Sequence, residues 1–341
     1  MGGGTRDPTL QASEGEAAEA GDRNGVGEHP NGSDDPTKRR GMLGPRPSLL
    51  RAFFAVLLAG VLAVGCGFGG GVDLTLGYLG WDENVANSNL VKVLLEDELG
   101  YESVELKSEA TVPQVFKDVA GGDTDLFLDA WMPNHRVYVK RGGDRIELSE
   151  EPWFSGETRF GIAVPKYMKA VRSIADLDDS GTDMITGIEP GAVMMKKIEG
   201  SVLPGYRLDS RLVEATTPAM LEELQKAYGF REPFVFLAWS PHWMNQEYDF
   251  HYLEDPKNAM GTVDAPQRLH SVMRSGFAED DPVAHALIVA MRLDEEQVGA
   301  LEISINEAKD PEKGVREWLE REKNRKVVRP WVEAARDAQE G

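Results

Sequence analysis

Three tryptophans occupy the same kind of position in the chain, each at the exit of an apolar, strand-like segment. Trp81, Trp131 and Trp239 all come within three residues of the end of such a segment. Strand exits in α/β folds face the region where ligands bind, whereas a core tryptophan normally lies within a strand or on a helix stripe. One tryptophan in this position is more often a packing residue. Three of them, in separate segments, favour a recognition site.

A box of indole faces has a specific chemistry. The face of each indole attracts a cation, and a quaternary ammonium group suits such a box because it has no N–H with which to donate a hydrogen bond. Each face contributes about 0.5–2 kcal/mol once the contact is desolvated. Three faces can hold such a cation without an ion pair, so we predict a ligand cage formed by Trp81, Trp131 and Trp239.

The segments that position the first two tryptophans alternate between strand and helix. Gly100 closes the first helix and Gly121-Gly122 closes the second, because glycine tolerates the left-handed conformation of a helix end. The β-α-β-α-β order implies a parallel or mixed sheet flanked by helices. The expected elements span residues 72–78, 84–99, 103–107, 112–120 and 125–130.

A second unit of the same kind positions the third tryptophan. Helices are expected to begin at Pro190 and at Thr217, where a capping residue precedes a proline. Beyond about residue 262 the pattern is helical to the end of the chain. The expected strands of this unit span residues 160–164, 183–188 and 234–238.

Together the two units predict an α/β fold with two lobes and a ligand cleft between them. We expect lobe 1 to begin with residues 72–159 and lobe 2 to comprise residues 160–250. The chain is expected to return to lobe 1 over residues 251–341, where C-terminal helices pack on it.

The composition is acidic. The chain has 341 residues and a formal net charge of −21, which disfavours nucleic acids and anionic lipid surfaces as partners because their phosphates would be repelled. Apolar residues make up 41% and charged residues 28%, which is typical of a globular protein.

The N-terminal 65 residues are not expected to belong to the fold. Residues 1–48 are rich in Gly, Pro, Asp, Glu and Ser, and we predict that they are disordered. Arg51 then precedes thirteen uncharged residues, a pattern typical of a secretory signal over residues 49–66. The run is short for a membrane-spanning helix, which needs about 20 residues. Met42 would give a more compact signal, which makes it a candidate start and the first 41 residues a candidate over-extension.

The single cysteine ends this signal. One cysteine excludes an internal disulfide and a cysteine-based zinc cluster. Leu62-Ala-Val-Gly-Cys66 resembles the lipobox of bacterial lipoproteins, which implies that Cys66 is lipidated and anchors the protein to the extracytoplasmic face of the cell membrane. The alternative is a plain signal peptide with an incidental thiol.

Five ordered motifs lie between residues 72 and 260. They are Gly80-Trp-Asp-Glu83, Asp129-Ala-Trp-Met-Pro133, Gly187-Ile-Glu-Pro-Gly-Ala192, Ala238-Trp-Ser-Pro-His-Trp-Met244 and Tyr252-Leu-Glu-Asp-Pro-Lys257. Together they resemble the glycine betaine/proline betaine-binding proteins of ABC importers. The resemblance implies a two-lobed periplasmic-binding-protein fold of type II, with Trp81, Trp131 and Trp239 around a trimethylammonium group. It also implies an ABC permease and its ATPase subunit as partners, a role in osmoprotectant uptake, and no cofactor or metal.

The resemblance further implies that backbone N–H groups of Gly187 and Ile188 bind the carboxylate of the ligand. A strand that ends just before Pro190-Gly191 presents free N–H donors to an anion. Some members of the family place a carboxylate-binding histidine five residues after the second cage tryptophan. Arg136 stands at that position here and His135 comes one residue earlier, so either side chain is a candidate, or both are solvated.

The sequence predicts the roles of the residues next to the cage less specifically. Asp82 and Glu83 either add negative potential near the cation or serve the start of a helix. His242 is expected to be a structural residue beneath the cage, and Trp243 a core residue.

An enzyme is the main alternative from another class, for example a hydrolase that uses Asp129 with Glu189. The sequence has no nucleophile elbow, metal-binding histidine cluster or phosphate loop, so we expect no catalysis. A sugar ligand would require several more polar side chains than these motifs contain. Choline and carnitine remain alternatives to glycine betaine, because they share the trimethylammonium group.

Overall fold

The computed structural model describes residues 73–263 and 265–341. The predictions for residues 1–66, including the signal and the lipidation of Cys66, lie outside the described residues. None of the described helices has the length and apolar character needed to cross a membrane.

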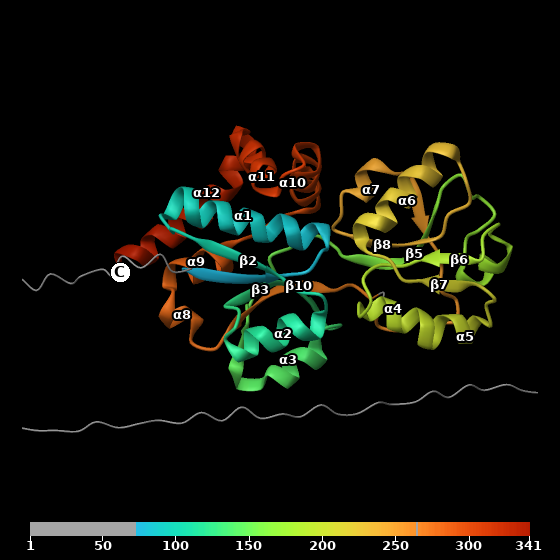
Figure 1. Ribbon diagram of the computed structural model, residues 1–341, viewed down its shortest axis with the longest axis horizontal. Coiled ribbons are helices and arrows are strands. Elements are labelled where there is room, and N and C mark those ends of the chain that lie inside the picture. The colour runs from blue at the N-terminus through green and yellow to red at the C-terminus, as the bar shows by residue number, and fades with distance from the viewer. Residues whose placement is uncertain (1–72, 264) are drawn as a thin grey trace, which may run out of the picture. The chain divides into compact units, whose positions relative to one another are not determined.

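The first of two five-stranded sheets has the strand order β2-β1-β3-β10-β4 (Figure 1). Strand β1 is parallel to β2 and β3, whereas β10 is antiparallel to both β3 and β4. The strands are β1 (Leu74–Tyr78), β2 (Val104–Ser108), β3 (Leu126–Met132), β4 (Ile146–Leu148) and β10 (Arg268–Arg274).

The second sheet repeats this arrangement, with the order β7-β6-β8-β5-β9. Strand β6 is parallel to β7 and β8, whereas β5 is antiparallel to both β8 and β9. Strands β3 and β8 are therefore equivalent, since each is the last parallel strand of its sheet. The strands are β5 (Arg159–Pro165), β6 (Met184–Thr186), β7 (Arg211–Val213), β8 (Phe236–Ser240) and β9 (Phe250–Tyr252).

Helices cover both faces of the first sheet (Figure 1). Helix α1 packs on one face and α2 on the other, while α10 and α11 pack against α1. The glycine-terminated ends are confirmed, because Gly100 and Gly122 have φ values of 82° and 77°. The helices are α1 (Asp82–Leu99), α2 (Val112–Gly121), α3 (Arg136–Gly142), η1 (Gly143–Arg145), α8 (Phe277–Asp280), α9 (Pro282–Ala290), α10 (Glu295–Ala308), α11 (Pro311–Glu320) and α12 (Glu322–Glu340).

The second sheet is covered in the same way. Figure 1 shows α6 and α7 on one side of it and α4 and α5 on the other. Helix α6 begins close to the predicted place, but its capping residue is Thr216 rather than Thr217: the Thr216 hydroxyl accepts from the Ala219 N–H, and Thr217 is the first helical residue. The helices are η2 (Ile174–Asp179), α4 (Val193–Lys197), η3 (Ile198–Val202), α5 (Leu203–Tyr206), α6 (Thr217–Phe230) and α7 (Met244–Glu247).

Three sequence predictions of the fold are wrong. The helix expected to begin at Pro190 begins at Val193, because Pro190 and Gly191 form a turn in which Gly191 has a φ of 106°. Residues beyond 262 are not helical throughout, because β10 enters the centre of the first sheet. The chain also returns to lobe 1 later than residue 251, since β9 pairs with β5 of the second sheet. Asp255 still belongs to lobe 2, where it accepts hydrogen bonds from the Tyr206 hydroxyl and the Met260 N–H.

Lobe 2 is thus an insertion into lobe 1 with two crossings, one before β5 and one before β10. The crossings are joined to each other at Thr158 and Gln267. The Gln267 N–H donates to the Thr158 hydroxyl at 2.5 Å, and that hydroxyl donates to the Gln267 carbonyl at 3.1 Å. Both residues are buried, so the two connections form one tied hinge.

Candidate ligand-binding site

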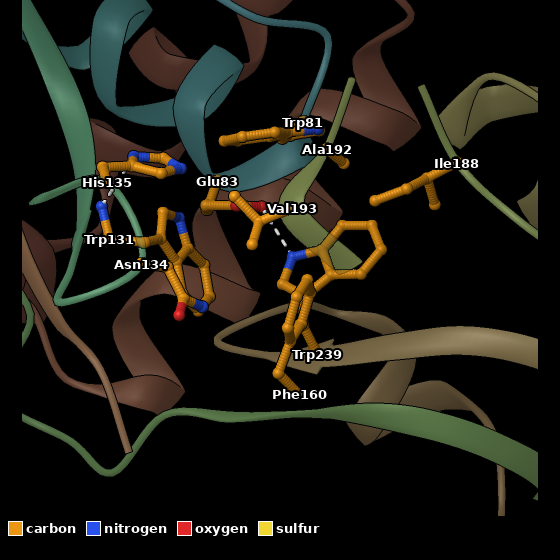
Figure 2. Close-up of a pocket in the computed structure, with 10 residues that line it drawn as sticks. All are labelled: Trp81, Glu83, Trp131, Asn134, His135, Phe160, Ile188, Ala192, Val193 and Trp239. Atoms are coloured by element: carbon orange, nitrogen blue, oxygen red, sulfur yellow. Dashed lines mark hydrogen bonds between the residues drawn. The ribbon is translucent and has the colours of Figure 1, made fainter. Parts of the chain in front are cut away.

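One pocket lies between the lobes and is lined by residues of both (Figure 2). The space between its lining residues has a volume of about 370 Å³, which includes the part open to solvent. The lining is mostly apolar. It consists of Trp81, Glu83, Trp131, Asn134, His135, Phe160, Ile188, Ala192, Val193 and Trp239.

The structure brings the three predicted tryptophans together in this pocket. Trp131 and Trp239 hold equivalent places, each one residue before the end of β3 or β8. Trp81 immediately precedes α1 and stacks over His135, with 6.3 Å between ring centroids. Equivalent strand ends from two similar sheets therefore supply facing walls of one cage.

Phe160 is a fourth aromatic wall that the sequence did not reveal. It lies opposite Trp239 in the register of β5 and β8, and its ring centroid is 5.7 Å from that of Trp131. Within the apolar run 160–164 it has the pattern of a core residue. Only the pairing of β5 with β8 could have identified it.

Two of the cage indoles are anchored through their N–H groups. The Trp131 Nε1–H donates to Asp129 Oδ2 at 3.1 Å, and the Trp239 Nε1–H donates to Glu83 Oε2 at 3.0 Å. The second bond joins β8 of lobe 2 to α1 of lobe 1 and is drawn in Figure 2. These hydrogen bonds fix the positions of the two indoles at the pocket.

A cluster of buried carboxyl groups lies behind the cage. Burial raises the pKa of Glu83 well above its ordinary value, and the nearby carboxyls of Asp129 and Glu302 raise it further. Burial also raises the pKa of Asp129 to about 7, against the opposing effect of hydrogen bonds from Trp131 and Glu83. The pKa of Glu302 is raised for the same reason, first by burial and then by Asp82.

His135 is the predicted carboxylate-binding side chain that lies in the pocket. Its Nδ1 accepts the Trp131 backbone N–H at 3.1 Å, which assigns the ring proton to Nε2. Burial lowers the pKa of His135 to about 3, so the imidazole is neutral at physiological pH. Figure 2 shows the far edge of the ring turned toward the pocket. Arg136 is exposed and is not among the lining residues.

The two predicted backbone donors differ. The Gly187 N–H already donates to the Val213 carbonyl at 2.8 Å, so it is engaged in the sheet rather than free for a ligand. The Ile188 N–H faces only the Met195 sulfur, at 3.4 Å, which is a weak acceptor. A side chain at Gly187 would come within 2.5 Å of that sulfur, so glycine lets this turn pack closely.

His242 and Trp243, the two remaining residues predicted to lie near the cage, do not line the pocket. His242 is buried beneath the cage, where its Nδ1 accepts the Met244 N–H and its ring lies edge-on to Trp239 at 4.6 Å. Trp243, expected to be a core residue, is only partly buried and packs against the core, and its indole N–H donates to Asp82 of lobe 1.

The proposed catalytic pair of the hydrolase alternative does not form. Glu189 accepts hydrogen bonds from the Thr217 N–H and hydroxyl at the start of α6, at 2.7 and 2.9 Å. It does not line the pocket, and Asp129 is anchored to Trp131 instead. Within residues 73–263 and 265–341, no group of three His, Cys, Asp or Glu side chains is placed to hold a metal ion.

Two similar lobes that enclose an aromatic pocket define the class of two-lobed solute-binding proteins. Residues 72–321 match the family described as the substrate-binding domain of ABC-type glycine betaine transport systems, and the chain belongs to this family.

Individual relatives agree with this placement. The chain is 31% identical over 161 residues to the glycine betaine/carnitine transport binding protein GbuC of Listeria monocytogenes serotype 1/2a (strain 10403S). The match covers 46% of this chain and 52% of the relative, so the chain spans about half the length of that curated protein.

Two solved structures share the fold. Lactococcal OpuAC, in a closed conformation with glycine betaine, is 30% identical, with a TM-score of 0.67 over 76% of this chain and 98% of that one. The glycine betaine/L-proline-binding protein ProX of Borrelia burgdorferi is 24% identical, with a TM-score of 0.67 over 77% of this chain and 99% of that one.

Proposed function

We propose that this protein is the substrate-binding component of an ABC importer, which captures glycine betaine or proline betaine and delivers it to the permease and its ATPase subunit for osmoprotectant uptake. The observation that carries the proposal is the cage itself. Trp81, Trp131 and Trp239, whose rings attract cations, line one small pocket, and hydrogen bonds from the N–H groups of two of them fix their positions.

Two donors in the pocket are candidates to bind the ligand carboxylate, and Figure 2 shows them at opposite ends of the lining. They are the Ile188 N–H, whose present partner is weak, and the neutral His135 ring through Nε2. Gly187 would contribute through its small size rather than through its N–H.

Because the cage takes walls from both lobes, ligand binding would favour the closed arrangement of the cleft. A ligand stabilises whichever conformation it contacts most extensively. The hinge at Thr158 and Gln267 is where the two crossings would have to bend. This coupling of capture to closure would allow a permease to distinguish loaded from empty protein.

Choline is a second candidate, favoured by one specific observation. Glu83 lines the pocket with a carboxyl group, which suits a ligand that has a cation but no carboxylate of its own. Carnitine shares the trimethylammonium group and is a further candidate ligand.

Titration of the purified protein with glycine betaine, proline betaine, choline, carnitine and maltose, followed by tryptophan fluorescence, tests the proposal. We expect quaternary amines to bind and maltose not to bind. Trp131→Ala should weaken binding at least about tenfold, because it removes one desolvated face worth up to about 2 kcal/mol together with its apolar contacts. Phe230→Ala, which removes an exposed aromatic outside the pocket, is the control. Intact betaine binding by Trp131→Ala would contradict the cage.

We also propose that Cys66 is lipidated and holds the protein on the extracytoplasmic face of the membrane. The support is the position of the only cysteine at the end of a signal-like segment. Incorporation of a labelled fatty acid into the wild type, and its loss in Cys66→Ala, would be the expected result. Equal labelling of both proteins would refute the anchor.

A further inference from the structure

Two buried carboxyl groups hold opposite walls of the cage. Asp129 receives the N–H of Trp131 from its own strand, and Glu83 receives the N–H of Trp239 from the other lobe. Glu83 also lines the pocket, so the same group touches the cage wall and faces the ligand space. Its hydrogen bond to Trp239 can form only when the lobes are together.

These carboxyl groups lack a basic counterpart. No lysine or arginine among residues 73–263 and 265–341 forms a hydrogen bond or ion pair with Glu83 or Asp129. Asp129 is fully buried, and its Oδ1 has no hydrogen-bond partner. The Glu83 and Asp129 carboxyl groups also interact with each other. Two interacting carboxylates in a buried site cannot both ionise without a large cost, because like charges repel strongly where water is excluded.

We propose that Glu83 and Asp129 hold one proton between them while the cage is empty, and that a quaternary ammonium group entering the cage displaces this proton to solvent. Glu83 is then a positioning residue for Trp239 and also the charge that distinguishes a cationic headgroup from an uncharged group of the same shape. This inference rests on the proposed function, since it requires a cationic ligand in the cage.

The other titratable groups around the pair do not supply positive charge. Asp82 from α1 and Glu302 from α10 are acidic, and burial raises the pKa of each. His135 and His242 are the nearby imidazoles, and burial lowers the pKa of both to about 3. A change in binding near neutral pH would therefore come from the carboxyl groups and not from a histidine.

The direction of the pH dependence follows from linkage. A bound cation favours the ionised carboxylate, so ligand binding releases a proton and the affinity rises with pH. Release of one full proton corresponds to about a tenfold gain in affinity per pH unit. Since burial raises the pKa of Asp129 to about 7 and that of Glu83 well above its ordinary value, the gain should begin near neutrality and continue above it.

Calorimetric titration of the wild type tests this without any substitution. The ligands are glycine betaine and 3,3-dimethylbutanoate, which replaces the nitrogen by carbon and keeps the shape and the carboxylate. In buffers of different ionisation heat at about pH 7, glycine betaine should release between about 0.5 and 1 proton per molecule bound. The carbon isostere, whose tert-butyl headgroup carries no charge, should release none, should bind more weakly, and should not gain affinity as the pH rises.

Glu83→Gln provides the matched variant, because the amide oxygen can still accept the Trp239 N–H while the charge is removed. We expect weaker betaine binding, no proton release and an affinity that hardly changes between about pH 6 and 8. Glu320→Gln, at an exposed position on α11, should behave as the wild type.

The outcomes separate the two proposals. Tight betaine binding by the wild type without proton release would overturn the shared proton and leave the proposed function standing. Equal proton release with the carbon isostere would also overturn it, because the ligand charge would then have no role. Failure of every quaternary amine to bind would overturn the proposed function itself.

Discussion

Neighbouring residues at the start of α3 have opposite environments. His135 is buried against Trp81 and accepts the Trp131 N–H, whereas Arg136 is the first residue of the helix and is exposed. The side chains of consecutive residues at a helix start point in different directions, so a shift of one residue decides which of them reaches the pocket. A histidine one place early in the chain can thus still face the ligand.

His135→Asn should weaken the binding of glycine betaine by about 10–100-fold. Asparagine can still accept the Trp131 N–H, but it loses the donor on the far edge of the ring, and a hydrogen bond to a charged group is worth about 1.5–3 kcal/mol. Calorimetry would measure both ligands: choline has no carboxylate, so its affinity should change much less. Arg136→Ala should leave betaine affinity within about twofold. A larger effect at Arg136 would reverse the assignment.

The sequence predicted those pocket residues whose position depends only on their own strand. The three tryptophans could be predicted because strand exits face ligands whatever the details of pairing. Phe160 could not, since its role depends on the register with Trp239 across two strands far apart in sequence. The engagement of the Gly187 N–H likewise depends on Val213, a neighbour that only the folded sheet supplies.

At the scale of elements, a close contact fixes α11 against α10. Gly314 lies where a side chain would come within 2.4 Å of the Ile305 Cα and 2.8 Å of the Ser304 carbonyl oxygen. Its own carbonyl accepts the Ser304 hydroxyl at 2.9 Å. Since α10 and α11 pack on α1, whose first turn carries Glu83, this contact supports the cage from outside.

Gly314→Ala should lower the free energy of unfolding by about 1–3 kcal/mol, because the added methyl group meets backbone atoms that cannot move aside individually. Gly229→Ala in α6 is the matched control, since nothing lies within 4 Å of the added atom. In a helix this change should stabilise by up to about 1 kcal/mol. Urea unfolding would measure both, and equal stability of the two variants would contradict the close contact.

Helices whose ends carry capping residues in the sequence were predicted well. The capping box of α10 is present, with the Asp294 carboxylate accepting the Gln297 N–H and the Gln297 side chain accepting the Asp294 N–H. Strand β10 was missed because its central residues are buried on both faces, which removes the alternation that marks a half-exposed strand. Its place between β3 and β4 is a non-local pairing that local patterns do not encode.

At the scale of the whole molecule, the buried carboxyl groups make stability depend on pH. An acid whose pKa is raised on folding stabilises the protein below its unfolded pKa, near 4, and this contribution is lost as the pH rises through the folded value. For Asp129 the folded value is about 7. Ligand-free protein should therefore lose stability between about pH 4 and 7 through this group.

Thermal unfolding of the wild type and of Asp129→Asn, at several pH values, would measure this loss. Asparagine keeps the acceptor for the Trp131 N–H and cannot ionise. The melting temperature of the variant, relative to that of the wild type, should therefore increase as the pH rises. Saturating glycine betaine should narrow the difference at high pH, because a bound cation compensates the charge. Parallel pH profiles without ligand would contradict a raised pKa at Asp129.

The two connections between the lobes are hydrogen-bonded to each other at Thr158 and Gln267, and this affects how segments of the protein can be exchanged. The intervening stretch leaves and re-enters the first sheet at adjacent points, so it has the geometry of a cassette with neighbouring ends. Phe160, Ile188 and Trp239 all belong to that single stretch, while Trp81 and Trp131 stay behind in the frame. Exchanging one continuous segment would therefore replace half of the recognition surface and leave the other half in place.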